Sequence, residues 1–592
     1  MKKAIGLLLV IGLLGAGAYF LIGSFSRPYP EKAFPRETIA YLSLHNIKEA
    51  RKNLDRTQLV QELKKSPRRN TYEHQISRLF SVFESVTGTD PRPLLKQFEK
   101  DIALAAFPIK AGQIGTALIA YVANEGETAE FFERKLDPNL KRRFPDLRKD
   151  YVTYEGVTYY KYSSKNLPPG ASPGYYLDGH HLAVAYTEES LRVLIGVGRK
   201  KRLPLAGNRV FEDSRKKIGY RRGILLFLDA QNAIQMVRSS IPPVKKNLYE
   251  SLFKIMGAQA LESFAYRISI KETGFEERGL LSVKPEREGL LKIYMDQEPQ
   301  KLSVLETIPS DARVLNASTM ADLAKMWDEI NAQLKSILPA DDYERWQKGV
   351  GLAKTVFNFD LRRDLLEPLG NEYAFAYEPG EITSDPSKTK LLVILQLRKP
   401  EKFQETVDRL VALASLRGIE KQQEDYRGKR MQILRLNIGN LSASPAMLLD
   451  GSRFFFSTDA SFLKKAIDAG QTRKTIASDP DYQKTTAGFP DRVNGLSYTS
   501  IQAYLQMYSS ILKQKMENEE NKWIREYGVQ EEFDALGKVL FGAASYTKFE
   551  KDGIYIYSYT SIPTPFLVPP ALITVLPEII EKYPGRRDFP SQ

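Results

Sequence analysis

The stretch ASPGYYLDG, residues 171–179, recurs as ASPAMLLDG at residues 443–451. In each copy an Asp-Gly pair, Asp178-Gly179 or Asp450-Gly451, separates two apolar runs. A two-residue hairpin turn needs residues that tolerate positive φ, and Asp-Gly is among its strongest signals. A helix-like pattern that starts on a polar residue follows both times. We therefore expect the same hairpin, followed by the same kind of helix, in both halves of the chain.

Other blocks recur in the same order on either side of this pair. Residues 34–44 match 308–317, residues 90–107 match 360–377, and residues 226–236 match 496–507. Several collinear matches at a nearly constant offset indicate a tandem duplication. The length of 592 residues also favours more than one core. The predicted domains are a signal-anchor segment at 1–26, a first repeat at 30–300, a second repeat at 301–562 and a proline-rich apolar tail at 563–592.

The periodicity within each repeat switches between helix and strand. Apolar residues at helical spacing over residues 323–338 predict an amphipathic helix with one buried stripe. The short apolar runs at 114–122 and 391–397 are typical of buried strands, and Thr273-Gly274 and Asp552-Gly553 predict further hairpins. Strands paired by hairpins, with helices between groups, indicate an α+β fold. We predict two tandem repeats, each a mainly antiparallel sheet with packed helices, after an N-terminal transmembrane helix.

The N-terminus carries an uncharged stretch, residues 4–23, after two lysines. Twenty residues at 1.5 Å rise per residue can cross a hydrocarbon core of about 30 Å. The lysines favour a cytoplasmic start and an exported bulk. A cleaved signal peptide is the alternative, because Ala16-Gly17-Ala18 fits a small-residue cleavage site. We expect a single-pass bacterial inner-membrane protein that is anchored through residues 4–23 and lies mainly in the periplasm.

The tail departs from the plan of the repeats. Seven prolines interrupt its apolar runs between residues 563 and 592. Such a stretch is too short and too often broken to span a bilayer as a helix. We expect it to pack on the second repeat, and docking to a partner is the alternative.

The composition leaves little material for cofactor chemistry. The chain has no cysteine and four histidines, which excludes disulfides, thiolate nucleophiles and iron–sulfur sites. Known phosphate loops, dinucleotide fingerprints, nucleophile elbows and zinc-protease motifs are absent from the sequence. The pair His180-His181 is a poor metal site, because successive strand residues point to opposite faces. We predict no catalytic, cofactor-binding or metal-ligating residue.

Carboxylates offer the only route to an enzyme. Asp178 and Asp450 recur in both repeats, and two acids can perform acid/base hydrolysis of a polysaccharide. A turn-forming role explains both residues without chemistry. Asp90 and Asp360 are likewise expected in turns or at helix N-caps.

Charge is more informative than motifs about the kind of partner, because the chain carries a net charge of +14. One stretch holds ten basic residues against Glu212 and Asp213, whereas the matching residues 469–492 are nearly neutral. These ten are Arg199, Lys200, Lys201, Arg202, Arg209, Arg215, Lys216, Lys217, Arg221 and Arg222. Such a surface attracts anionic lipid, acidic envelope polymers or an acidic protein partner. A solvated loop is the alternative, and nucleic acid is not expected for an exported protein.

A family resemblance follows from several of these elements. The proline-containing opening at residue 35, the helix pair after it, Gly88-Thr89-Asp90, and the strand-then-helix order ending near Met236 resemble the bacterial domain of unknown function 3352. The resemblance implies an exported or envelope-associated protein and supplies no catalytic motif. We expect a non-enzymatic, membrane-anchored envelope protein with a binding or scaffolding role. The alternative is a carboxylate-dependent hydrolase of envelope polysaccharide.

Overall fold

The computed structural model describes residues 30–65, 80, 83–110, 113–220, 223–378, 390–416, 419–438, 441–506 and 535–566. The predicted anchor at 4–23 and the tail beyond residue 566 lie outside this part of the chain. Within the described ranges, no helix combines the length and the apolar character that crossing a membrane requires.

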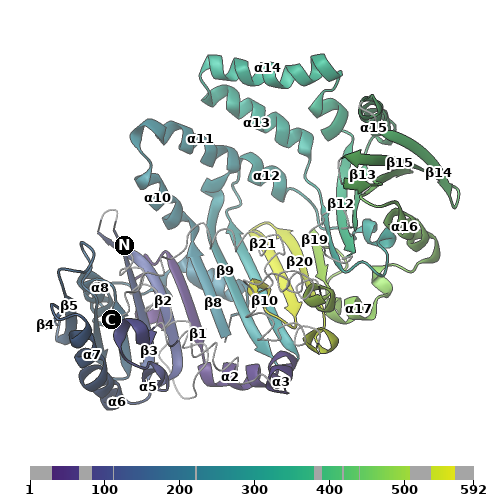
Figure 1. Cartoon of the computed structure of the whole chain (residues 1–592). Helices are drawn as coiled ribbons and strands as arrows, with labels where there is room; N and C mark the ends of the chain where they lie inside the picture. The colour runs from purple at the N-terminus through teal and green to yellow at the C-terminus, as the bar shows by residue number, and fades with distance from the viewer. Residues whose placement is uncertain are drawn as a thin grey trace.

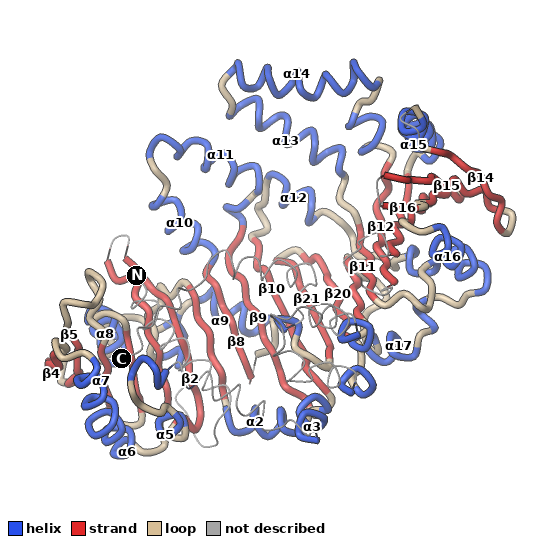
Figure 2. The backbone as a smooth tube through the Cα atoms, in the orientation of Figure 1, coloured by secondary structure: helices blue, strands red, loops and turns tan. Residues whose placement is uncertain are grey.

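The described strands of both halves form one antiparallel sheet (Figures 1 and 2). The first half contributes, in order across the sheet, β4 (Arg148–Tyr154), β5 (Val157–Ser163), β6 (Gly174–Asp178), β7 (His181–Ala185), β3 (Gln113–Val122), β2 (Phe98–Lys110), β1 (Ala40–His45), β8 (Gly223–Asp229), β9 (Leu261–Lys271) and β10 (Gly274–Val283). The second half continues from β10 with β21 (Gly553–Thr560), β20 (Ala543–Glu550), β19 (Gly495–Thr499), β11 (Val314–Thr319), β12 (Leu369–Glu378), β13 (Lys390–Leu397), β18 (Arg453–Ser457), β17 (Ala446–Asp450), β15 (Lys429–Ile438) and β14 (Glu420–Tyr426). The short β16 (Leu441–Ala443) pairs with β15.

The two halves follow the same strand order outward from the centre. The strand β1 lies between β2 and β8, and β11 lies between β12 and β19. Helices and antiparallel strands alternate along the chain, which confirms the predicted α+β class. The matching order is the one that a duplicated unit gives.

The halves meet where β10 pairs with β21. Phe275 lies opposite Thr560, and Leu281 lies opposite Ile554. The prediction gave each repeat a sheet of its own, but these backbone hydrogen bonds join the two sheets into one. Each of the joining strands is the second strand of a hairpin, so it reaches the centre with one edge still unpaired.

Helices cover both faces of the sheet in the first half. On one face lie α8 (Glu188–Gly198) and α9 (Arg209–Lys217), over a core that includes Ala103 and Ala105 of β2. On the other face lie α5 (Arg92–Leu95), α6 (Glu125–Glu130), the π-helical turn η3 (Phe131–Leu136) and α7 (Asp137–Arg143). The core there includes Ile102 of the same strand, because successive strand residues point to opposite faces.

The second half has related helices. These are the π-helical turn η8 (Leu361–Leu366), α15 (Pro400–Ser415), α16 (Ala460–Thr472) and α17 (Pro480–Thr486). The helix α16 follows its hairpin as α8 does in the first half, and its Phe462 and Leu463 are fully buried. The core of this half is therefore built on the same plan.

The remaining helices lie beyond the two ends of the strands. Figure 1 shows α10 (Ala230–Ser240), α11 (Lys246–Met256), α12 (Gly289–Met295), α13 (Leu323–Ile337) and α14 (Ala340–Phe357) beyond one end, and α2 (Ile47–Arg56) and α3 (Gln58–Lys65) beyond the other. The predicted helix at 323–338 is confirmed as α13.

These helices pack across the two halves in both directions. The second-half helix α13 contacts α11 and α12 of the first half. Beyond the opposite ends of the strands, Leu59 and Leu63 of α3 pack against Leu536 and Leu540 of the second half. Each half thus supports a helical segment of the other.

Candidate functional site

The predicted hairpins form at both Asp-Gly pairs, but each loop lies one residue later than the sequence suggested. Asp178 pairs with His181 and Asp450 pairs with Arg453, so the loops are Gly179-His180 and Gly451-Ser452. Gly179 and Gly451 adopt φ of 61° and 58°, the left-handed region in which glycine is favoured. Asp178 forms an ion pair with Arg199 at 3.6 Å, and Asp450 forms one with Lys429 at 2.5 Å.

The two aspartates do not share a cleft. Their hairpins lie in different halves, with every strand from β3 to β13 in sheet order between them. At about 4.8 Å per strand this separation is tens of ångströms. Asp178 and Asp450 therefore cannot act together as the acid/base pair on which the hydrolase alternative was based.

Asp90 and Asp360 sit where the sequence placed them. The Asp90 carboxylate accepts a hydrogen bond from the Arg92 backbone amide at 3.0 Å, just before α5. Asp360 is the N-cap of η8 and accepts from the Arg363 amide at 3.0 Å. Both satisfy amides at the start of a helical turn.

The two adjacent histidines belong to the edge of the β6–β7 hairpin. His180 Nδ1 lies 3.0 Å from the Val122 carbonyl oxygen, and its ring stacks on Tyr121 with centroids 5.1 Å apart. His181 meets the same ring edge-on at 5.8 Å, and burial lowers the pKa of His181. Across the described part of the chain, no group of three or more acids and histidines has a geometry that suits a metal ion.

The predicted basic surface is divided between two places. At the end of α8, Lys201 pairs with Glu155 at 2.5 Å, and Arg199 pairs with Asp178. At the end of α9, Lys217 pairs with Asp552 at 2.7 Å, in the central hairpin of the second half.

Other charges of the stretch are balanced locally. Arg209 pairs with Asp213, and Arg215 pairs with Glu212 and Glu31. Lys200, Arg202 and Lys216 are exposed without an ion pair in the described ranges, and Arg221 and Arg222 lie outside them. Five of the eight described cations of the stretch are therefore in ion pairs, and an anionic-partner surface there stays a prediction.

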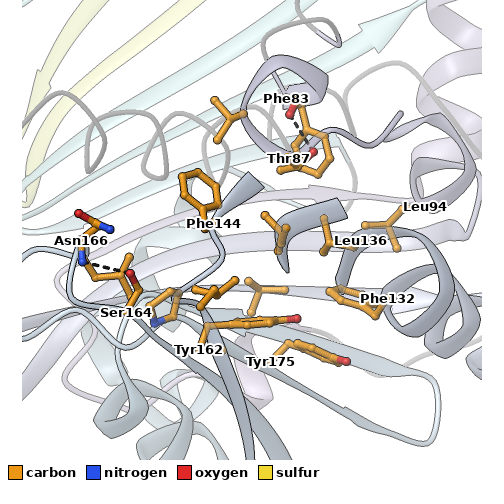
Figure 3. Close-up of a pocket in the computed structure, with 17 residues that line it drawn as sticks. Phe83, Thr87, Leu94, Phe132, Leu136, Phe144, Tyr162, Ser164, Asn166 and Tyr175 are labelled. Atoms are coloured by element: carbon orange, nitrogen blue, oxygen red, sulfur yellow. Dashed lines mark hydrogen bonds between the residues drawn. The ribbon is translucent and has the colours of Figure 1, made fainter. Parts of the chain in front are cut away.

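An apolar pocket lies beneath the helices of the first half (Figure 3). Its volume is about 160 Å³. The walls come from the sheet, from η3 and α7, and from the helical turn around Phe83. The residues that line it include Phe83, Val86, Leu94, Phe132, Leu136, Leu140, Phe144, Leu147, Tyr162, Ser164, Asn166, Tyr175 and Val184.

The π-helical turn η3 shapes this pocket. It presents Phe132 and Leu136, which are both buried, and α7 continues with Leu140. A π turn inserts an extra residue into the helical repeat and rotates the side chains that follow. The second half covers the corresponding face of its sheet with the regular helix α15. The pocket therefore lies where the two repeats differ in backbone.

The tyrosines of the wall keep their hydroxyl groups occupied elsewhere. The Tyr162 hydroxyl donates to Asp137, and Lys149 Nζ lies 3.0 Å from the Tyr175 hydroxyl. Burial, aided by the Asp137 charge, raises the pKa of both tyrosines. Phe132 stacks on Tyr175 with centroids 4.0 Å apart. The two tyrosine rings therefore present carbon atoms to the pocket. Their hydroxyl groups point to the Asp137–Lys149 ion pair at one end of it.

A polar lip borders the other end of the pocket. The Asp146 carboxylate accepts from the Ser164 hydroxyl at 2.5 Å and from the Asn166 side chain at 3.2 Å. The backbone N–H of Asn166 donates to the Ser164 hydroxyl at 3.0 Å, as the dashed line in Figure 3 marks. This network holds the strand-to-loop segment at the mouth.

Basic residues flank the mouth, and the sequence reasoning missed them. They neighbour the lining residues Leu140, Phe144 and Leu147 in the chain, and they are exposed. No ion pair joins them to another described residue. They are Lys141, Arg142, Arg143, Arg148 and Lys165. The signal in the sequence is the run KRRFPDLRKD at residues 141–150, which is about as basic for its length as residues 199–222.

Comparisons with known proteins identify a family. The family model described as "Protein of unknown function (DUF3352)" matches residues 4–432 and again residues 340–524. No curated protein matches the chain. One solved structure, crystal form IV of TP0453, is similar over 43% of this chain and 81% of its own, at 10% identity and a TM-score of 0.23. A score that low carries no argument about fold or function. The two family matches together span most of the sequence, and the chain belongs to the DUF3352 family.

Proposed function

We propose that this protein binds an anionic amphiphile, with the hydrocarbon part in the apolar pocket of the first half. The single observation that carries the proposal is the pocket wall, where even Tyr162 and Tyr175 turn their hydroxyl groups to Asp137 and Lys149. A ligand inside therefore meets no unsatisfied donor or acceptor from these two rings. Contact with carbon alone selects a hydrocarbon.

The size of the pocket sets the length of that hydrocarbon. An apolar cavity of about 150 Å³ lined by Leu, Ile and Phe stays dry and accepts benzene. The pocket here has about 160 Å³. It therefore suits about six carbon atoms, as one ring or as the end of an alkyl chain.

The charge at the mouth favours an anionic head group. Five exposed cations, Lys141 to Arg143, Arg148 and Lys165, are near neighbours in the chain of residues that line the pocket, against the two carboxylates of Asp146 and Asp150. Each lysine or arginine near an anionic lipid surface contributes on the order of 1 kcal/mol. A carboxylate or phosphate at the mouth would reach these side chains while its chain stays in the pocket.

The expected cellular setting belongs to the same proposal. We infer a tandem duplication from the recurring sequence blocks and the matching strand order. We place the protein in the bacterial inner membrane through residues 4–23, with its bulk in the periplasm and a non-enzymatic role. Anionic lipid, an envelope polymer or an acidic protein remains the expected partner class, and nucleic acid is not expected.

Isothermal titration of the purified full-length protein with decanoate tests the binding. The variant Leu140→Trp fills the pocket from its half-buried edge and should abolish binding. The control Leu352→Trp changes a side chain that is 62% exposed on α14, and it should bind like the wild type. Equal binding by both variants would contradict the proposal.

The contribution of the head group is measured separately with decan-1-ol. The alcohol should bind the wild type more weakly than decanoate. The double variant Arg143→Gln and Arg148→Gln should weaken decanoate and leave the alcohol unchanged. Equal affinity for decan-1-ol and decanoate would show that the basic residues at the mouth do not contribute to binding.

A further inference from the structure

A second, polar cavity opens at the edge of the first half, beside α2 and Gly219. Its volume is about 410 Å³, and none of its lining residues lines the apolar pocket. The side chains used here are Asn46, Asn53, Arg267, Ser269 and Lys271. Glu49 also lines it.

Positive charge is in excess beside this cavity. Glu276 is the shared partner of three cations: Arg267 contacts it, the Arg278 Nε atom lies 3.1 Å away, and the Lys271 Nζ atom lies 3.8 Å away. Glu276 and the lining residue Glu49 carry two negative charges against these three positive ones. Burial lowers the pKa of Arg267, and the neighbouring Arg278 adds to the effect. An additional anion would relieve this repulsion.

Arg267 retains a donor for such an anion. Its side chain is 9% exposed, and its terminal nitrogens donate to the Gly219 carbonyl and to Glu276. The buried Nε atom has no hydrogen-bond partner among the described residues. A buried donor left unsatisfied is unfavourable, so an acceptor supplied by a ligand would stabilise the fold.

The second half does not repeat this arrangement. Counted from the hairpin glycines Gly274 and Gly553, the residue equivalent to Arg278 is Tyr557. Its cross-strand partner is Tyr546, as Arg267 is the cross-strand partner of Arg278. The two tyrosines stack with centroids 5.4 Å apart. Two arginines in the first repeat therefore correspond to two stacked tyrosines in the second. The shared fold does not require the arginines, so their charge is a feature of the first half alone.

We propose that this cavity binds an oxyanion, a phosphate or carboxylate group, between Arg267 and Lys271. Arginine holds such groups through directed, charge-assisted hydrogen bonds. The Ser269 hydroxyl supplies a further donor from the same strand, β9, as Arg267 and Lys271. Asn53 on α2 also lines the cavity, and its side-chain amide donates to the Ile270 carbonyl oxygen at 3.4 Å. The cavity volume of about 410 Å³ leaves room for an anion that is part of a larger molecule.

The test is the melting temperature of the full-length protein in inorganic phosphate, against chloride at the same ionic strength. Ligand that binds only the folded state raises stability with concentration. We expect phosphate to raise the melting temperature, and Lys271→Gln and the isosteric Asn53→Asp to weaken its apparent affinity about tenfold. Arg267→Gln should abolish the rise. The exposed α13 control Lys335→Gln should behave as the wild type.

Two further arms complete the test. Binding to phosphatidylglycerol vesicles that is lost in Asn53→Asp, without a rise in inorganic phosphate, would assign the oxyanion to a lipid head group. A phosphate effect of equal size in Asn53→Asp, Lys271→Gln and Lys335→Gln, or none with either probe, overturns the proposal. The pocket variant Leu140→Trp should leave the phosphate effect intact, so this site and the apolar pocket can fail separately.

Discussion

Arg278 lies directly opposite Tyr557 where the two halves of the sheet meet, with its guanidinium carbon 5.6 Å from the centroid of the tyrosine ring. Both residues occupy the same place after their hairpin glycines, Gly274 and Gly553. A strand pair in which equivalent residues face each other has an approximate twofold axis between them. The two repeats are therefore related by this axis and continue one sheet.

The central strand pair should be sensitive to a single methyl group. A Cβ atom at Gly553 would lie 2.5 Å from the Leu281 carbonyl oxygen, across the junction. We predict that Gly553→Ala lowers the free energy of unfolding by about 1–3 kcal/mol, because the strands must separate to admit it. Denaturation in urea measures the loss.

Gly349 on α14 provides the matched control. A Cβ atom there meets nothing within 4 Å. Gly349→Ala should be neutral or stabilise by up to about 1 kcal/mol, because alanine favours the helix. Equal stability of Gly553→Ala and the wild type would mean that β10 and β21 are not paired in this register.

The packing of helices across the halves predicts a long-range effect. Leu59 of α3 lies in one apolar cluster with Leu536 and Leu540. Leu59→Ala should cost about 1–2 kcal/mol, less than a fully buried leucine, and should speed amide hydrogen exchange at Leu540. Amide exchange in α13, which lies beyond the opposite ends of the strands, should not change. Unaltered exchange at Leu540 would show that α3 does not support the second half.

Acid should weaken one buried contact of the second half. Hydrogen bonds from Arg363 lower the pKa of Asp364 to about 2, and the Asp364 side chain is 3% exposed. A lowered pKa contributes stability above the unfolded pKa of about 3.9, and this contribution disappears as the pH falls through about 2. Asp364→Asn should therefore cost about 2 kcal/mol at neutral pH.

The pH dependence identifies the cause of that loss. Unfolding is followed for the wild type and Asp364→Asn between pH 2 and 7. The difference between them should be constant above about pH 4 and should shrink towards pH 2. A difference that does not change with pH would assign the loss to packing instead of charge.

Enlarging the apolar pocket should change its ligand preference. Phe132 is buried and forms one wall. Phe132→Ala should lower the free energy of unfolding by about 3–5 kcal/mol and leave a larger cavity. In a titration with alkanoates, the affinity should then reach its plateau at a longer chain than in the wild type. A plateau at the same chain length in both proteins would place the ligand elsewhere.

The sequence predicted the features that depend on neighbouring residues. The hairpins at Gly179 and Gly451 follow from turn chemistry, and α13 follows from its apolar spacing. The pairing of β10 with β21 was not predictable, because it joins edges almost 280 residues apart and leaves no periodic signal. The continuous sheet is therefore a finding of the structure.

The candidate site was less predictable than the fold. Phe132 and Leu136 resemble ordinary core residues of an amphipathic helix, and the π turn that exposes them to a pocket has no signature in one sequence. The ion pairs of the basic stretch at 199–222 were unpredictable for a related reason. Its residues are adjacent in the chain, but α9 carries Lys217 to the central hairpin while Arg199 stays beside Asp178.

The most direct test of the apolar site is a series of alkanoates from four to twelve carbons, titrated into the full-length protein. Each methylene buried should add about 0.8 kcal/mol to the binding free energy. We predict this slope up to about six buried carbons, where the pocket of about 160 Å³ is full, and then a plateau. Binding that does not depend on chain length, or no binding at all, would contradict the account.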